Sequence, residues 1–275
     1  MNPSLAFVAV LAAAAPQPRL TSDQLAAVRM IAVQDGGRVK PLDTFARETA
    51  RRIGGARAFG AESIRGLDPA EWVLAMVADP EGWRSEPMVR VTSAELRQAI
   101  SLPADRDRFS FAELAGHRPF TDLAASIQDR LRADPETRLQ PVDQEAQNLY
   151  GALSIVGAIY SGEALRVVPR PGEPEAAWLT LAELASATGD LARARDGFGS
   201  LVTAYAAGDG AAVGDSAEEL RARLGALAPG LYPNEADLAR EVRYNVGKPF
   251  RGAWTFYLLG LVFLLSSLPL NVRRL

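Results

Sequence analysis

The organisation of this sequence follows from one apolar stretch near its C-terminus, Gly252-Ala-Trp-Thr-Phe-Tyr-Leu-Leu-Gly-Leu-Val-Phe-Leu-Leu-Ser-Ser-Leu-Pro-Leu-Asn-Val272, which contains no charged residue. A helix rises about 1.5 Å per residue, so a helix of this length spans roughly 30 Å, the thickness of a hydrocarbon core. The sequence therefore predicts a transmembrane helix over residues 251–272. The alternative is a buried core helix of a globular protein.

The residues that flank this stretch predict its orientation. Trp254 and Tyr257 lie at one end, where amphipathic rings favour the headgroup boundary, and Arg273 and Arg274 lie at the other. Cytoplasmic flanks carry an excess of positive charge, although Lys248 and Arg251 weaken the asymmetry. We therefore expect a single-pass anchor in the inner membrane, with a cytoplasmic tail at 273–275 and the bulk of the chain in the periplasm.

The N-terminal residues 1–18 form a second apolar segment. Eleven apolar residues, Leu5 to Ala15, are too few to span a bilayer but resemble the hydrophobic region of a secretory signal, and the first basic residue is Arg19. A short helix that rests on the membrane is the alternative. Both interpretations predict that residues 19–250 form an exported domain.

The composition excludes many functions. The chain has 275 residues, of which 33 are acidic, 30 basic, one histidine and none cysteine. Disulfides, thiolate metal sites and covalent haem attachment through cysteine are therefore excluded. A net charge of −3 with interspersed signs gives no sign of nucleic-acid binding. No pair of carboxylates has a spacing typical of acid–base catalysis, so we name no catalytic residue and expect a protein that is not an enzyme.

The exported domain is predicted to be mainly α with minor β. Val142 to Tyr160 has the clearest helical pattern, with an apolar stripe at three- and four-residue spacing formed by Ala146, Leu149, Leu153, Val156 and Ile159. Further helices are expected at 180–188, 190–207, 215–227 and 233–246. Residues 30–41 predict a hairpin that turns at Asp35-Gly36, and Asp43 or Thr44 is expected to cap a helix that ends at Gly54-Gly55.

A short motif recurs three times, in Val89–Leu96, Arg108–Leu114 and Ala177–Leu184. Each segment places a few extended residues before the pattern [ST]-x-x-E-L. This pattern predicts that a hydroxyl group caps the next helix and that the glutamate returns to the cap amide. The unequal spacing argues against a solenoid of repeats.

The densest polar segment is Asp35–Glu48. Amides at a helix start, together with Arg38, Lys40, Asp43, Thr44 and Arg47, are candidates for contact with an anion, such as a haem propionate, or with a partner protein. The simpler interpretation is a hairpin and a capped helix that exchange solvated charge pairs.

His117 is a candidate axial haem ligand or partner contact, and the alternative is a hydrogen bond to a carbonyl or water. It would also be the only base for an exported hydrolase. Met30, Met76 and Met88 are predicted to fill gaps in the core, and Trp72, Trp83 and Trp178 to be core or groove-lining residues.

Three segments together resemble one family: Ile31–Glu48, Asp79–Val91 and Glu241–Tyr257. They are similar to the extracytoplasmic region, and the start of the next transmembrane helix, of long bacterial cytochrome c biogenesis proteins of the system II (Ccs/Res) type. The similarity runs over about residues 25–270. The patterns G-R-x-K-P-L-D-T-F-A-R-E and Y-N-x-x-x-P-F are fairly specific.

The resemblance implies a haem-delivery and cytochrome c assembly context. The tryptophan-rich W-G-x-W-W-D segment and paired histidines of that family do not occur in this sequence, so the resemblance transfers no catalytic residue, and haem is expected only through a partner. The leading hypothesis is a membrane-anchored periplasmic accessory protein that docks a haem-handling membrane protein. The alternative is a structural subunit of a respiratory or photosynthetic electron-transfer complex.

Overall fold

The computed structural model describes residues 20–55, 65–247 and 249–267. Two predictions fall outside them: the signal-like or membrane-resting segment at 1–18, and the cytoplasmic tail with Arg273 and Arg274. The described part is mainly helical with few strands, which confirms the predicted fold class.

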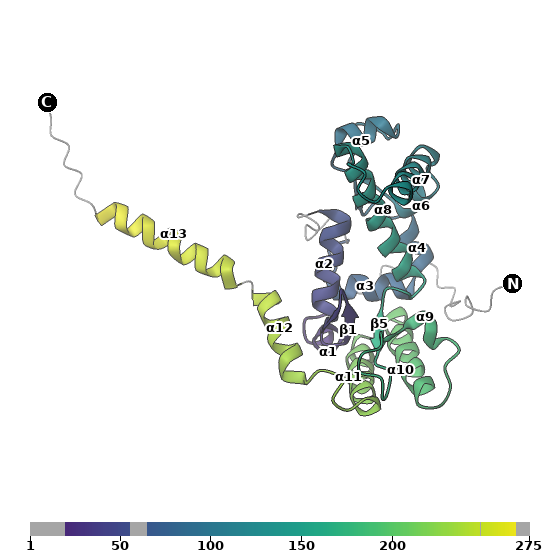
Figure 1. Cartoon of the computed structure of the whole chain (residues 1–275). Helices are drawn as coiled ribbons and strands as arrows, with labels where there is room; N and C mark the ends of the chain where they lie inside the picture. Colours follow the sequence, from purple (N-terminus) through teal and green to yellow (C-terminus); the bar gives the residue numbers. More distant parts are fainter. Residues whose placement is uncertain (1–19, 56–64, 248, 268–275) are drawn as a thin grey trace.

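Most of the described chain forms one globular body, from which α12 and α13 lead away (Figure 1). The helices are α1 Gln24–Arg29, α2 Leu42–Gly54, α3 Pro69–Ala78, α4 Pro80–Arg84, α5 Ala94–Ala99, α6 Phe111–Ala115, α7 Arg118–Ala133, α8 Pro141–Tyr160, α9 Leu181–Leu184, α10 Gly189–Ala206, α11 Gly210–Leu227, α12 Glu235–Gly247 and α13 Pro249–Ser267. The strands are β1 Ala32–Asp35, β2 Arg38–Pro41, β3 Val89–Arg90, β4 Arg108–Phe109, β5 Arg166–Val168 and β6 Leu179–Thr180, paired as three two-stranded antiparallel ribbons.

The predicted hairpin is confirmed. β1 pairs with β2 in the register Ala32 to Pro41 and Asp35 to Arg38. Gly36 and Gly37 adopt φ values of 59° and 81°, which residues with a Cβ rarely adopt. Positive φ at both central residues is the requirement of a tight two-residue hairpin turn. The hairpin leads without a loop into α2.

The expected cap of α2 is wrong. The residue before α2 is Pro41, which makes no side-chain cap, and Asp43 and Thr44 lie inside the first turn of the helix. Their side chains instead face α12, as described below. The predicted end of the helix is correct, because α2 ends at Gly54 and Gly55 follows with a φ of 77°.

The recurring motif forms the predicted cap at two of its three positions. Ser110 with Glu113, and Thr180 with Glu183, make both reciprocal bonds of a capping box. In the remaining motif, Val89–Leu96, the cap is Ser93 rather than Thr92, and the Ser93 hydroxyl accepts a hydrogen bond from the Leu96 amide. The short entry strands of the first two motifs, β3 and β4, pair with each other. In each motif a short strand of a two-stranded ribbon thus precedes the first residue of a helix.

The start of α11 differs from the prediction because of tertiary packing. The helix predicted at 215–227 starts earlier than expected, because α11 begins at Gly210, where the Asp209 side chain accepts a hydrogen bond from the Ala212 amide. A Cβ at Gly210 would lie 2.4 Å from the Gln24 side chain of α1. Glycine at this position permits the close approach of the two helices, which outweighs its low helix propensity.

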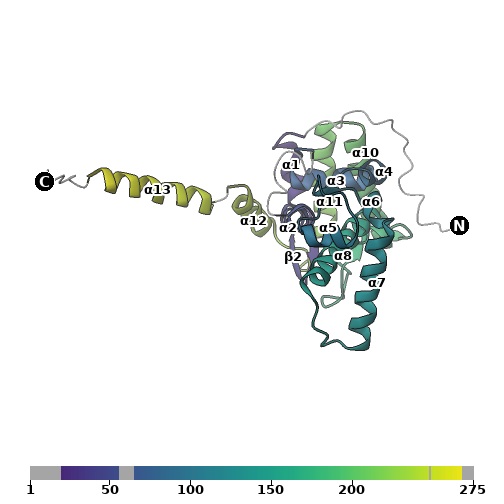
Figure 2. The ribbon, with the colours of Figure 1, turned by 90° about the horizontal axis from the view of Figure 1, so that it is seen from above.

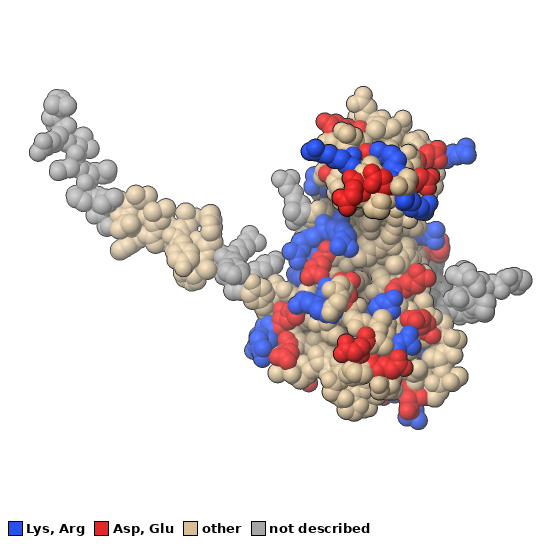
Figure 3. Space-filling model, viewed as in Figure 1, with Lys and Arg blue, Asp and Glu red and all other residues tan. Residues whose placement is uncertain are grey.

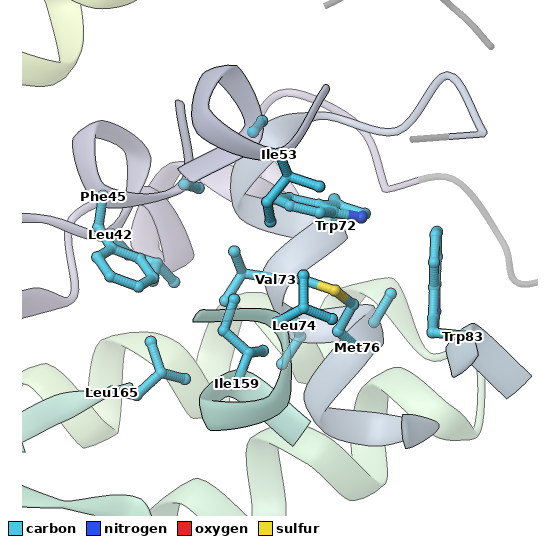
Figure 4. Close-up of a cluster of buried hydrophobic side chains, with 14 of the residues drawn as sticks. Leu42, Phe45, Ile53, Trp72, Val73, Leu74, Met76, Trp83, Ile159 and Leu165 are labelled. Carbon is cyan, nitrogen blue, oxygen red and sulfur yellow. The ribbon is translucent and has the colours of Figure 1, made fainter. Parts of the chain in front are cut away.

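The main core cluster extends from Leu20 to Leu224, and a smaller cluster contains Ala32, Trp178 and Leu238. The predicted stripe of α8 is buried throughout, and so are Trp72, Trp83 and Trp178. Figure 4 shows Trp72 of α3 between Ile53 of α2 and the side chains of Val73 and Met76, with Ile159 of α8 below them. α3 lies at the centre of this core, since eight of its residues, Pro69 to Met76, are buried.

The C-terminal helix α13 has no contact that buries its apolar surface. Its exposed large side chains are Trp254, Phe256, Tyr257, Leu258, Leu259, Leu261, Val262, Phe263, Leu264 and Leu265. Because they occupy nearly consecutive positions, they cover every face of the helix. Figure 2 shows α13 extending from the body through α12, and Figure 3 shows no charged side chain on the described part of α13 that faces the viewer.

No single helix of the described part is both long and apolar enough to cross a membrane. The pair Glu235–Gly247 and Gly252–Ser266, which meet at a bend of 42°, satisfies this requirement of length and composition together. The single span expected over 251–272 stays a prediction, and its last residues lie outside the described part.

Candidate functional site: the joint between the hairpin and α12

The predicted polar segment Asp35–Glu48 faces α12. Glu241 of α12 accepts hydrogen bonds from Arg38 at 2.6 Å and from the Thr44 hydroxyl at 2.7 Å. Asn245, one turn further along α12, donates to Asp43 Oδ2 at 3.0 Å and to Thr44 Oγ1 at 2.7 Å. We call these five residues, Arg38, Asp43, Thr44, Glu241 and Asn245, the α12 joint.

Asp43 is the most buried member of the joint, with an exposed fraction of 0%. Its Oδ2 atom accepts from Arg47 Nε at 2.8 Å as well as from Asn245. Its Oδ1 atom is buried without a hydrogen-bond partner in the described structure. A buried carboxylate is tolerated only when it is paired and hydrogen-bonded, so Arg47 and Asn245 together stabilise the charge.

Lys40 lies beside the joint and is nearly buried. Its Nζ atom donates to Asp35 Oδ2 and to Glu48 Oε2, each at 2.7 Å. Burial alone would lower the pKa of Lys40, but these two hydrogen bonds and the two negative charges outweigh it and raise the pKa. Lys40 is therefore a cation at neutral pH, and it connects the β1–β2 hairpin to α2.

An apolar cluster completes the contact between α12 and the body. Leu238 of α12 is buried with Ala32 and Trp178. The Trp178 ring stacks on Tyr232 with centroids 5.9 Å apart, and the Tyr232 hydroxyl accepts from the Ala32 amide at 3.0 Å. Burial raises the pKa of Tyr232, so its hydroxyl stays neutral. α12 is thus held to the body by the hydrogen bonds of Glu241 and Asn245 and by the packing of Leu238 against Trp178.

The joint brings together two of the three segments that carry the family resemblance, Ile31–Glu48 and Glu241–Tyr257. Arg38 and Glu241 are 203 positions apart in the sequence. The third segment, Asp79–Val91, contributes Trp83, Met88 and Val89 to the core. Of the charged residues of the first segment, Arg38 and Asp43 bind α12, whereas Lys40 joins the hairpin to α2 through Asp35 and Glu48.

This geometry limits what an anion could contact at the predicted site. Arg38 pairs with Glu241, Lys40 with Asp35 and Glu48, and Arg47 with Asp43. A bound carboxylate or phosphate would have to displace one of these carboxylates. The contact of Arg38, Lys40, Asp43, Thr44 and Arg47 with an anion or partner stays a prediction.

His117 lies apart from the joint, immediately before α7. Its Nε2 atom is 2.6 Å from the carbonyl oxygen of Ile100, and the residue is half-buried. Across the described residues, no group of three or more His, Asp or Glu side chains could hold a metal ion. Haem contact by His117 stays a prediction, as do the anchoring roles of Trp254 and Tyr257, which are 67% and 78% exposed.

Sequence reasoning missed Glu241 and Asn245 as members of this site. They belong to the resemblance segment Glu241–Tyr257, and no local pattern predicts a partner some 200 residues away. Their spacing is the available signal, since residues four apart lie on one face of a helix.

The comparisons with known proteins give one distant similarity. No family model matches the chain. Protein NrfI of Wolinella succinogenes is 28% identical over 152 residues, which is 54% of this chain and 16% of that protein. This chain thus corresponds to a small part of the length of the relative.

We expect Asn245→Ala to loosen α12 without unfolding the body. The change removes two hydrogen bonds and leaves the Asp43 carboxylate with one donor fewer. One net hydrogen bond contributes about 1 kcal/mol, so amides of residues 235–247 should exchange about fivefold faster in hydrogen–deuterium exchange. Asn148→Ala, on the exposed face of α8, is the matched control. Unchanged exchange in α12 would contradict the role of the joint.

Proposed function

We propose that this chain is a membrane-anchored accessory protein of cytochrome c biogenesis that has no catalytic activity of its own. Protein NrfI, with which it shares a distant similarity, is related to cytochrome c maturation, and this fits a biogenesis role in general terms. The system II resemblance of the three segments supports the same context. In this proposal α13 lies in the inner membrane, the body lies on the periplasmic side, and haem is held by a partner.

The observation that carries the membrane part of the proposal is the uncovered surface of α13. Burial of apolar surface is worth about 25 cal/mol per Å², so a helix apolar on every face requires lipid or protein around it. Trp254 and Tyr257 lie near the end of α13 that joins the body, where aromatic side chains favour the membrane interface. The α12 joint would then set the orientation of the body above the bilayer.

Deletion of the gene tests the biogenesis role. We expect covalently bound haem in periplasmic c-type cytochromes, measured by haem staining of denaturing gels, to fall in the deletion strain and to recover when the full chain is supplied in trans. Cytochromes of the b type are the control, because their haem is not covalently attached. Normal c-type cytochrome levels in the deletion strain would contradict the proposal.

Co-purification separates the proposal from the alternative. A biogenesis factor should be recovered with a haem-handling membrane protein in amounts that vary with cytochrome synthesis. Stoichiometric recovery with a stable cytochrome-containing complex would instead support a structural subunit. In both cases alkaline carbonate should leave the chain in the membrane fraction, and its release would contradict anchoring by α13.

A further inference from the structure

A groove of about 470 Å³ lies between α1 and α12, directly beside the point where α12 leads into α13. Its apolar lining consists of Ala26, Met30, Ala236, Ala239, Val242 and Val246. The opposite face of α12 is held against the body by Leu238, Glu241 and Asn245. The groove side of α12 therefore cannot turn inward to cover these residues, and the groove stays open.

Three arginines and one carboxylate, Asp23, line the same groove, and Arg29 is paired with Asp68 at 2.9 Å. Among the described residues Arg240 pairs with Asp237 alone, on its own helix, and this pair is largely exposed. Arg243 is exposed, and no carboxylate of the described residues pairs with it. The groove thus combines an apolar floor with cationic side chains, which is the pattern required to hold an apolar chain with an anionic head.

The position of the groove indicates the source of such a ligand. In both Figure 1 and Figure 2, α12 lies between the body and α13. α12 and α13 meet at a bend of 42°. If a membrane surrounds α13, its headgroup layer lies at the start of α13, which is next to the end of α12. Cationic side chains at that level meet lipid phosphates.

We propose that the groove between α1 and α12 takes up one anionic phospholipid from the leaflet that surrounds the start of α13. The acyl chain lies on Ala26, Ala239 and Val242, and the phosphate contacts Arg243 and Arg240. The bound lipid joins the body to the bilayer at a second place, beside α13. This inference rests on the anchoring in the proposed function.

Single-cysteine labelling tests the proposal cleanly, because the chain has no cysteine of its own. A bimane fluorophore is placed on Ala26→Cys, an exposed groove residue of α1, in the full chain in nanodiscs of phosphatidylcholine and phosphatidylglycerol. Phosphatidylglycerol with a spin label on its acyl chain should quench the fluorophore at least as strongly as headgroup-labelled lipid. Ala125→Cys, exposed on α7, should not be quenched. Leu259→Cys, in the middle of α13, should be quenched by the chain label.

The outcomes separate the inference from the proposed function. Quenching at Leu259→Cys without quenching at Ala26→Cys would overturn the lipid site and leave the anchoring intact. Quenching at Ala26→Cys by the headgroup label alone would show a surface near the bilayer that holds no chain, and would also overturn the site. Absence of quenching at Leu259→Cys would overturn the anchoring itself.

A charge reversal tests the role of Arg243. One cation near an anionic surface contributes about fivefold to binding. Arg243→Glu should therefore lower the lipid affinity, measured by titrating the chain-labelled lipid against quenching at Ala26→Cys, by at least about fivefold. Arg118→Glu makes the same change of charge on α7, at the opposite side of the body (Figure 2), and should have no effect. Equal quenching in the two variants would overturn the role of Arg243.

Discussion

Replacement of Trp72 by alanine should lower the free energy of unfolding by about 3–5 kcal/mol, the usual cost of removing a large aromatic side chain from a core. Trp72 is 1% exposed and lies at the centre of the cluster between α2, α3 and α8 (Figure 4). Its indole nitrogen has no hydrogen-bond partner in the described structure. The loss should therefore come from packing and not from a broken hydrogen bond.

Urea unfolding of the full chain in detergent, followed by circular dichroism, measures this effect. Trp72→Phe, which keeps most of the ring volume, should cost clearly less than Trp72→Ala. Tyr150→Ala is the matched control, because this aromatic residue is 48% exposed, and its removal should change the stability by less than about 0.5 kcal/mol. Equal losses at Trp72 and Tyr150 would contradict the central role of α3.

The second large effect is expected at Arg47. In Arg47→Met the Asp43 carboxylate stays fully buried and keeps only the donor of Asn245. Removal of one partner of a buried ion pair typically costs about 3–5 kcal/mol, because the remaining charge is uncompensated. The exposed Arg52 lies on the same helix, so Arg52→Met is the control and should be nearly neutral.

A second substitution distinguishes the effect of the uncompensated Asp43 charge from the effect of lost packing. Asp43→Asn in the Arg47→Met background removes the negative charge with little change of shape, so the double variant should be more stable than Arg47→Met alone. The same urea titration provides the comparison. If the double variant were no more stable, the cost of Arg47→Met would not arise from the buried carboxylate of Asp43.

Local features of the fold were predictable from the sequence. The Asp35-Gly36 turn, two of the three capping boxes and the stripe of α8 depend on residues within a few positions of one another, where backbone sterics and helix periodicity decide the result. In these segments the local preferences and the tertiary structure agree.

The site was predictable only in part. The sequence singled out Arg38, Lys40, Asp43, Thr44 and Arg47, but not what they contact. Asp43 and Thr44 satisfy the local rule for a helix cap, yet their side chains bind Arg47, Glu241 and Asn245 because α12 packs on this face of α2. A partner 200 positions away leaves no trace in the local pattern, so this contact required the structure.

The separation between Arg38 and Glu241 has a consequence for how the protein is made. Ribosomes add about 5–20 residues per second, so the hairpin waits roughly 10–40 s before α12 is synthesised. During this time Asp43 and Thr44 lack Asn245 and Glu241 and remain hydrated. The α12 joint can therefore form only after the segment next to α13 has been made, so this contact is among the late steps in the folding of the described chain.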